Sequence, residues 1–114
     1  MKDLFDVDHF LDSVVQDRGL AVVLVEAFIE DCPKRVAELT RALAEDDTDK
    51  AGKLAHSLKG MCGVVRAGAL SRLALAMEFA AQDGDLDSVR KRLGMFIEEL
   101  DQAMALMEDF TSRC

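Results

Sequence analysis

The sequence predicts an all-α protein, an antiparallel up-and-down four-helix bundle with an additional short N-terminal helix. The composition is rich in Ala, Leu, Glu and Lys, with one Pro and neither Trp nor Tyr, which favours helices over sheets. Apolar residues also recur at helical spacing along most of the chain. A chain of 114 residues is large enough for one core and too small for two, so we expect residues 1–114 to form a single domain.

Two helical segments are expected before residue 45. Asp6 can cap the first, a short helix whose apolar face comprises Val7, Phe10, Leu11 and Val14. Gly19 marks the break before a longer segment, whose apolar stripe comprises Leu20, Leu24, Phe28, Cys32, Val36, Leu39 and Leu43. Pro33 lies inside this stripe and is expected to kink the helix or split it in two, because proline lacks the backbone donor of a helix.

The rest of the chain predicts three more helices joined by short connections, which make neighbouring helices antiparallel. The acidic turn at residues 45–49 can cap a helix near residues 48–65, and Asp83-Gly84-Asp85 separates a fourth helix from the last. The fourth helix has an apolar side formed by Leu70, Leu73, Met77 and Ala80. The last has the most regular stripe, formed by Leu86, Val89, Leu93, Phe96, Leu100, Ala103, Met107 and Phe110.

The helix near residues 48–65 has two contrasting faces. At about 100° per residue, four apolar residues gather opposite His56: Leu54, Leu58, Met61 and Val65. This stripe should face the core and leave His56 in solvent. Within about 60° of His56 there is no bulky apolar residue, and the residues found there include Gly52, Lys53, Lys59, Gly60 and Gly63.

Glycines on this exposed face need a physical reason, because each glycine inside a helix costs about 1 kcal/mol relative to alanine. Fraying of the helix or tight packing between helices is the simplest explanation. We favour another, that the missing side chains let the backbone of a partner protein approach His56.

His56 has the properties of a phosphoryl acceptor. An imidazole with its ordinary pKa of about 6.5 offers a neutral ring nitrogen near pH 7, and the labile P–N bond of phosphohistidine suits transfer in both directions. Lys53 and Lys59, one turn before and one turn after, can stabilise the phosphoryl anion. His9 is expected to be an ordinary surface residue without a basic or glycine-lined face, since its neighbours include Asp6, Asp8 and Asp12.

The segment His56-Ser57-Leu58-Lys59-Gly60 resembles the signature of histidine-containing phosphotransfer (HPt) domains, commonly H-[TS]-[LIV]-K-G-S. The likeness extends over nearly the whole chain, through Phe28-Ile29-Glu30-Asp31-Cys32-Pro33 upstream and Ala67, Leu70, Leu73, Met77-Glu78 and residues 82–85 downstream. The resemblance implies a helical bundle phosphorylated on His56, with Lys59 holding the phosphoryl group and Gly60 giving a receiver domain room to approach. It also implies two kinds of partner, a sensor or hybrid histidine kinase and the receiver domain of a response regulator.

Three residues depart from the family pattern. Met61 stands where a small residue, often Ser, is usual, and its position toward the core should affect packing only. Val64 replaces a small polar residue, and Arg66 replaces a frequent Gly at the helix end.

The surface expected to contact the partner combines the exposed glycines of this helix with the two residues at its end. It comprises Gly52, Gly60, Gly63, Val64 and Arg66.

The charge distribution indicates an acidic partner. A net charge of −8 disfavours nucleic acid or an anionic membrane surface, yet residues 50–77 contain five Lys and Arg and no Asp or Glu. No metal or cofactor site is expected in this chain, because it has no acidic cluster beside His56. The Mg²⁺ used in phosphoryl transfer and the acceptor Asp are expected from the receiver domain.

The remaining features predict a monomer of the cytoplasm. The longest uncharged stretch, residues 19–25, is far too short to span a membrane, and the N-terminus has no signal-peptide core. Three cysteines lack metal-ligand spacing and are expected to be reduced thiols: Cys32, Cys62 and Cys114. The starting Met and the compact length favour a free-standing protein.

Three alternative functions remain open. The chain could dock a kinase or receiver without being phosphorylated, although such a module would not need an intact His-x-x-Lys-Gly. It could bind a metal or haem, but neither Glu-x-x-His nor His-x-x-x-His occurs. It could be an enzyme, such as a phosphatase of receivers, yet it has no P-loop or kinase signature. We therefore expect a phosphocarrier and not an enzyme.

Overall fold

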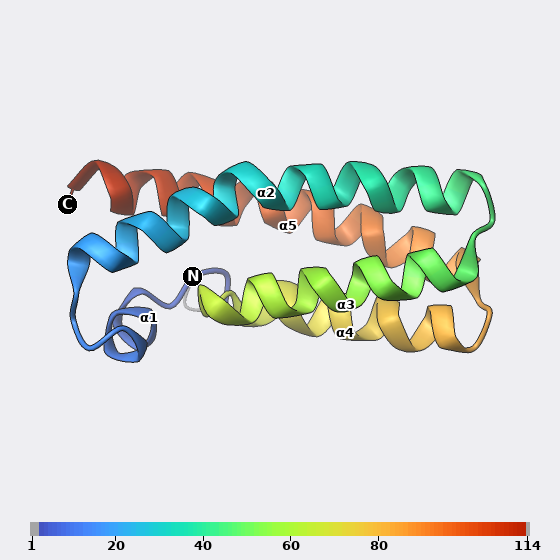
Figure 1. Ribbon diagram of the computed structural model, residues 1–114, viewed down its shortest axis with the longest axis horizontal. Helices are drawn as coiled ribbons and strands as arrows, with labels where there is room; N and C mark the ends of the chain where they lie inside the picture. Colours follow the sequence, from blue (N-terminus) through green and yellow to red (C-terminus); the bar gives the residue numbers. More distant parts are fainter. Residues whose placement is uncertain (1–2, 114) are drawn as a thin grey trace.

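The computed structural model describes residues 3–113, which form five helices joined by short connections. The helices are α1 (Val7–Ser13), α2 (Arg18–Ala44), α3 (Thr48–Val64), α4 (Gly68–Gln82) and α5 (Leu86–Arg113). Figure 1 shows α2 beside α5 and α3 beside α4, with consecutive long helices running in opposite directions and α1 at one end of the bundle. The predicted antiparallel four-helix bundle with an extra N-terminal helix is confirmed.

Aspartate side chains start four of the helices. The carboxylates of Asp6, Asp17, Asp47 and Asp85 each accept a hydrogen bond from a backbone N–H three residues later, at 3.0–3.1 Å. These contacts satisfy amides that have no partner within the helix. Among the described residues no side chain caps α4, whose Ala69 N–H instead donates to the carbonyl of Asp3 at 2.8 Å. The N-terminal segment therefore helps to hold the start of α4.

Gly84 ends α4 as its sequence predicts. Its φ of +74° lies in the left-handed region that glycine adopts without steric cost. The Gly84 N–H donates to the carbonyl of Ala81, and the Asp85 N–H donates to that of Ala80, so the last carbonyls of the helix are satisfied.

The core lies between the four long helices and includes the predicted residues Leu58 and Val65, both almost fully buried. Seven of the eight stripe residues of α5 are buried, from Val89 to Phe110. At one end of the bundle, the rings of Phe5, Phe10 and Phe110 pack with centroids 5.7–6.1 Å apart. This aromatic cluster attaches the N-terminal segment and α1 to the end of α5.

One of the two alternatives for Pro33 is excluded, and one residue of the predicted stripe of α2 needs correction. Pro33 does not split the segment, because α2 continues through it as one helix that changes direction along its length in Figure 1. The exposed proline removes only one backbone hydrogen bond, and the neighbouring Phe28 and Cys32 remain buried in the core. Leu20 is not part of the core stripe, since it is 45% exposed. The buried face starts instead with Ala21 and Val25, which keep the alternating spacing of Phe28 and Cys32.

Within residues 3–113, no helix is both long enough and apolar enough to span a membrane.

Candidate functional site

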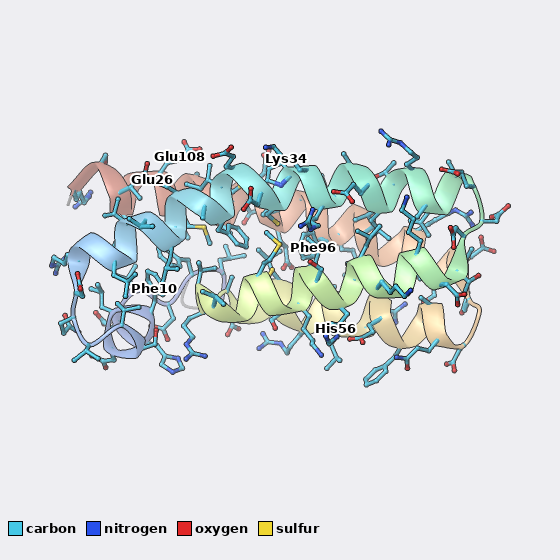
Figure 2. The ribbon with its side chains drawn as sticks, in the orientation of Figure 1. Phe10, Glu26, Lys34, His56, Phe96 and Glu108 are labelled. Carbon is cyan, nitrogen blue, oxygen red and sulfur yellow. The ribbon has the colours of Figure 1, made fainter. Side chains whose placement is uncertain are left out.

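His56 projects from the outer face of α3. Its side chain is 64% exposed, whereas Leu54, Leu58 and Cys62 on the opposite face are buried. Figure 2 shows this arrangement, with Phe96 between the helices and His56 at the outer edge of the α3–α4 pair. The predicted division of α3 into a core face and a histidine face is confirmed.

Glu78 of α4 contacts both functional candidates of α3. Its Oε2 lies 3.0 Å from His56 Nδ1, and its Oε1 lies 3.3 Å from Lys59 Nζ. The Glu78 side chain is only 15% exposed. Its Oε1 receives no hydrogen bond from any described residue, so the contact with Lys59 is an ion pair without the alignment of a hydrogen bond.

The close approach of α3 and α4 brings Glu78 to His56. Ala74 and Ala81 lie one turn on either side of Glu78, and both small side chains are buried. A Cβ on Gly52, one turn before His56, would lie 3.6 Å from the Cβ of Ala81. This is an ordinary van der Waals distance, so packing between the helices does not require glycine at position 52. The contact of Gly52 with a partner stays a prediction.

Glu78 fixes the chemical state that His56 presents to solvent. A carboxylate is only an acceptor, so the neutral imidazole must place its proton on Nδ1 to make this hydrogen bond. The lone pair then lies on Nε2. An exposed ring with a basic nitrogen facing solvent has the arrangement that a nucleophile requires.

A polar groove of about 480 Å³ lies beside His56 between α3 and α4. Its wall comprises Thr48, Asp49, Gly52, Lys53, His56, Glu78, Ala81 and Gln82. The exposed Lys53 therefore borders the same space as the imidazole, one turn before it along α3. Lys59, 32% exposed, lies one turn after it. The structure thus brings both predicted lysines to the histidine.

The surface that follows His56 along α3 is open. Cβ atoms on Gly60 and Gly63 would meet no described atom within 4 Å, so these glycines are not required by packing. Val64 is 53% exposed and borders a small apolar groove between α2 and α3, lined also by Leu24, Ala27, Phe28, Asp31, Met61 and Val65. An apolar groove thus adjoins the glycine-lined face.

Arg66 adopts a backbone conformation that favours glycine. Its φ is +58°, in the left-handed region where side chains other than glycine are strained. The chain has just left α3 here and turns toward α4. The exposed arginine thus adds charge to the turn at a conformational cost.

Residues 50–77, which contain no Asp or Glu, contact acidic side chains from other parts of the folded chain. Glu78 pairs with Lys59, and Asp3 pairs with Arg72 at 3.5 Å. Both acids come from outside residues 50–77, so only the folded chain brings them to these cations. The other cations of residues 50–77, Lys50, Lys53 and Arg66, are exposed.

His9 does not have the purely acidic surroundings expected from the sequence. It borders a hollow of about 310 Å³ that is lined by Gly63, Arg66 and Gly68 as well as by Asp3 and Asp6. The expectation failed because α1 packs near the connection between α3 and α4, a contact between segments far apart in the sequence.

Two of the three cysteines are buried inside the bundle. Cys32 of α2 and Cys62 of α3 are free thiols, and a hydrogen bond with Cys32 raises the pKa of Cys62 well above its ordinary value, with burial acting in the same direction. Cys114 lies outside the described residues. Within residues 3–113, no group of three His, Cys, Asp or Glu side chains is placed to hold a metal ion.

Comparison with known proteins agrees with this architecture. The family model of the Hpt domain matches residues 23–109. The crystal structure of histidine-containing phosphotransfer protein B (HptB) from Pseudomonas aeruginosa PAO1 superposes with a TM-score of 0.91 at 24% identity, covering 97% of this chain and 96% of that one. The HPT domain from the Hpt sensor hybrid histidine kinase from Shewanella superposes with a TM-score of 0.87 at 16% identity, covering 100% and 98% of the two chains. A search of curated proteins finds no match. Because the family model covers most of the sequence, the chain belongs to the Hpt domain family, the histidine phosphotransfer proteins of phosphorelay signalling.

Proposed function

We propose that His56 is the phosphoryl acceptor of this phosphotransfer protein and that the phosphoryl group is carried on Nε2. The observation that supports this most directly is the contact of Nδ1 with Glu78 at 3.0 Å on a 64% exposed ring. It leaves Nε2 as the free nucleophilic atom. The motif His56-Ser57-Leu58-Lys59-Gly60, shared with the family, supports the same residue.

The chemical step requires little from this chain beyond positioning. The Nε2 lone pair attacks phosphorus, the bond between phosphorus and the donor atom breaks, and the electron pair leaves with that atom, the oxygen of a receiver aspartate or the nitrogen of a small phosphoramidate. The Nδ1 proton stays beside Glu78. In the reverse direction, or in transfer to a receiver aspartate, the P–N bond breaks and its electron pair returns to Nε2. We therefore assign this chain the role of phosphocarrier, with Mg²⁺ and the catalytic acids supplied by the kinase or receiver.

Lys59 and Lys53 are proposed to stabilise the phosphoryl oxygens. Both are within one turn of His56, and a charge-assisted contact with phosphate is stronger than a neutral hydrogen bond. The receiver is proposed to approach over Gly60 and Gly63, where open space replaces side chains. Val64 and Arg66 would contact its edge, and Gly52 would lie near the other end of that surface.

The proposal also covers the oligomeric state, the location and the partners of the chain. We propose that residues 1–114 act as one monomeric domain in the cytoplasm, with a histidine kinase and a receiver domain as partners and no nucleic acid. The net charge of −8 disfavours binding to polyanions. The basic residues Lys50, Lys53 and Arg66 instead match the acidic pocket in which a receiver holds its metal and aspartate.

Labelling by a cognate kinase or a phosphorylated receiver tests the proposal. The 114-residue protein should gain one acid-labile, base-stable phosphate, and His56→Gln should abolish it. His9→Gln is the matched control and should leave labelling intact, although His9 also borders a hollow with an arginine. Labelling that survives His56→Gln would refute the site. Receiver binding without any labelling would support the alternative, a docking module that is not phosphorylated.

A further inference from the structure

We infer that Glu78 shortens the lifetime of the phosphorylated state, because it competes with the phosphoryl group for the ammonium group of Lys59. This inference rests on the proposed phosphorylation of His56. It assigns Glu78 a role separate from its hydrogen bond with the imidazole, namely control of how firmly the phosphoryl group is held.

The geometry places one cation between two anionic sites. In the unphosphorylated protein, Lys59 Nζ lies 3.3 Å from Glu78 Oε1. Lys59 also lies one turn beyond His56 on the same helix, and residues three apart are neighbours on a helix surface. A phosphoryl group on Nε2 would therefore lie within reach of the same ammonium.

The pairing with Glu78 should resist displacement. Oε1 is buried and receives no hydrogen bond from the described residues, so Lys59 is the positive group closest to it in the structure. Moving Lys59 fully to the phosphoryl group would leave this buried oxygen without a counter-charge, which is unfavourable. Lys59 is therefore shared, and its contact with the phosphoryl oxygens is weaker than that of an unpaired lysine.

A weaker contact makes the phosphoryl group easier to release. The transition state of phosphoryl transfer is loose and resembles metaphosphate, whose oxygens share one negative charge, whereas the oxygens of the bound phosphoryl dianion share two. A cation on those oxygens therefore stabilises the phosphorylated state more than the transition state. As the P–N bond breaks, its electron pair returns to Nε2, and phosphorus bonds to an oxygen of water or of the receiver aspartate.

Glu78→Gln separates the two roles of the residue. The amide oxygen of Gln can still accept the Nδ1 proton, but the variant has no charge to hold Lys59. After phosphorylation by phosphoramidate, a small donor that needs no docking, ³¹P NMR measures the hydrolysis of phosphohistidine at fixed pH. We expect Glu78→Gln to lengthen the lifetime by about threefold to tenfold, equivalent to roughly 0.7–1.4 kcal/mol. Glu98→Gln on α5, which removes the same charge from an exposed site, is the matched control and should change nothing.

A double-mutant cycle tests the competition itself. Lys59→Ala should shorten the lifetime, and adding Glu78→Gln to Lys59→Ala should give no lengthening, because the contested cation is gone. A lifetime that Glu78→Gln leaves unchanged, or lengthens equally without Lys59, would overturn the inference while His56 remains phosphorylated. Failure of His56 to be phosphorylated by both the small donor and the protein partner would instead refute the proposed function, and this inference with it.

Discussion

Replacement of Gly60 by glutamine separates docking from folding. A Cβ at this position meets no described atom within 4 Å, so the bundle has room for the side chain. Gln is a better helix former than Gly by several tenths of a kcal/mol, which predicts an unfolding midpoint raised by about 2–4 °C. The same side chain projects into the space proposed for the receiver. Binding and phosphotransfer should therefore fall by at least about tenfold, equivalent to about 1.4 kcal/mol at the interface.

Gly94 offers a matched control for this experiment. It lies within α5, and a Cβ there also meets no described atom within 4 Å, but it borders a hollow between α2 and α5 and not the face of His56. Gly94→Gln should raise thermal stability to a similar degree and leave transfer unchanged. Thermal denaturation gives the stability of both variants, and titration with a receiver domain gives the affinity. If Gly60→Gln unfolds the protein, or folds and binds the receiver as tightly as the unmodified chain, the docking argument fails.

Two further predictions concern the backbone and the thiols. Arg66→Gly should stabilise the protein by about 0.5–1 kcal/mol, because it relieves a left-handed φ of +58°. Urea denaturation measures the free energy of unfolding, and the control variant Arg66→Ala should show no such gain. A loss of stability in Arg66→Gly would contradict the strain. The hydrogen bond with Cys32 and burial raise the pKa of Cys62, so this thiol should stay protonated and react slowly with iodoacetamide across pH 7–9. Peptide mass spectrometry with and without denaturant compares the alkylation of Cys62 in the unfolded and the native protein. Fast alkylation of the native protein would contradict the prediction.

The helices could be predicted from sequence because their signals are local. Asp6 and Gly84 act on the backbone within a few residues of themselves, and the stripe of α5 follows from its spacing alone. The same periodicity placed His56 opposite Leu58, so the exposure of the histidine did not depend on knowing the fold. Leu20 was misplaced because the predicted stripe began one residue before the buried face, which starts with Ala21 and Val25.

The contacts of the site could not be predicted in the same way. Glu78 reaches His56 only because α3 and α4 pack closely, a relation between segments 22 residues apart. One signal in the sequence pointed to Glu78, the only acidic residue between positions 68 and 82. It lies between Ala74 and Ala81 at helical spacing, on a face whose small side chains allow another helix to approach. The surroundings of His9 were likewise hidden, because they depend on where α1 packs.

Nitrogen-15 NMR of the histidine rings, combined with ³¹P coupling, tests the central claim most directly. In the unphosphorylated protein, His56 should carry its neutral-state proton on Nδ1, as the contact with Glu78 requires. After phosphorylation by a cognate receiver or kinase, one phosphorus should couple to Nε2 of His56 and to neither nitrogen of His9. Phosphorus on Nδ1 of His56, on His9, or on no histidine would contradict the account.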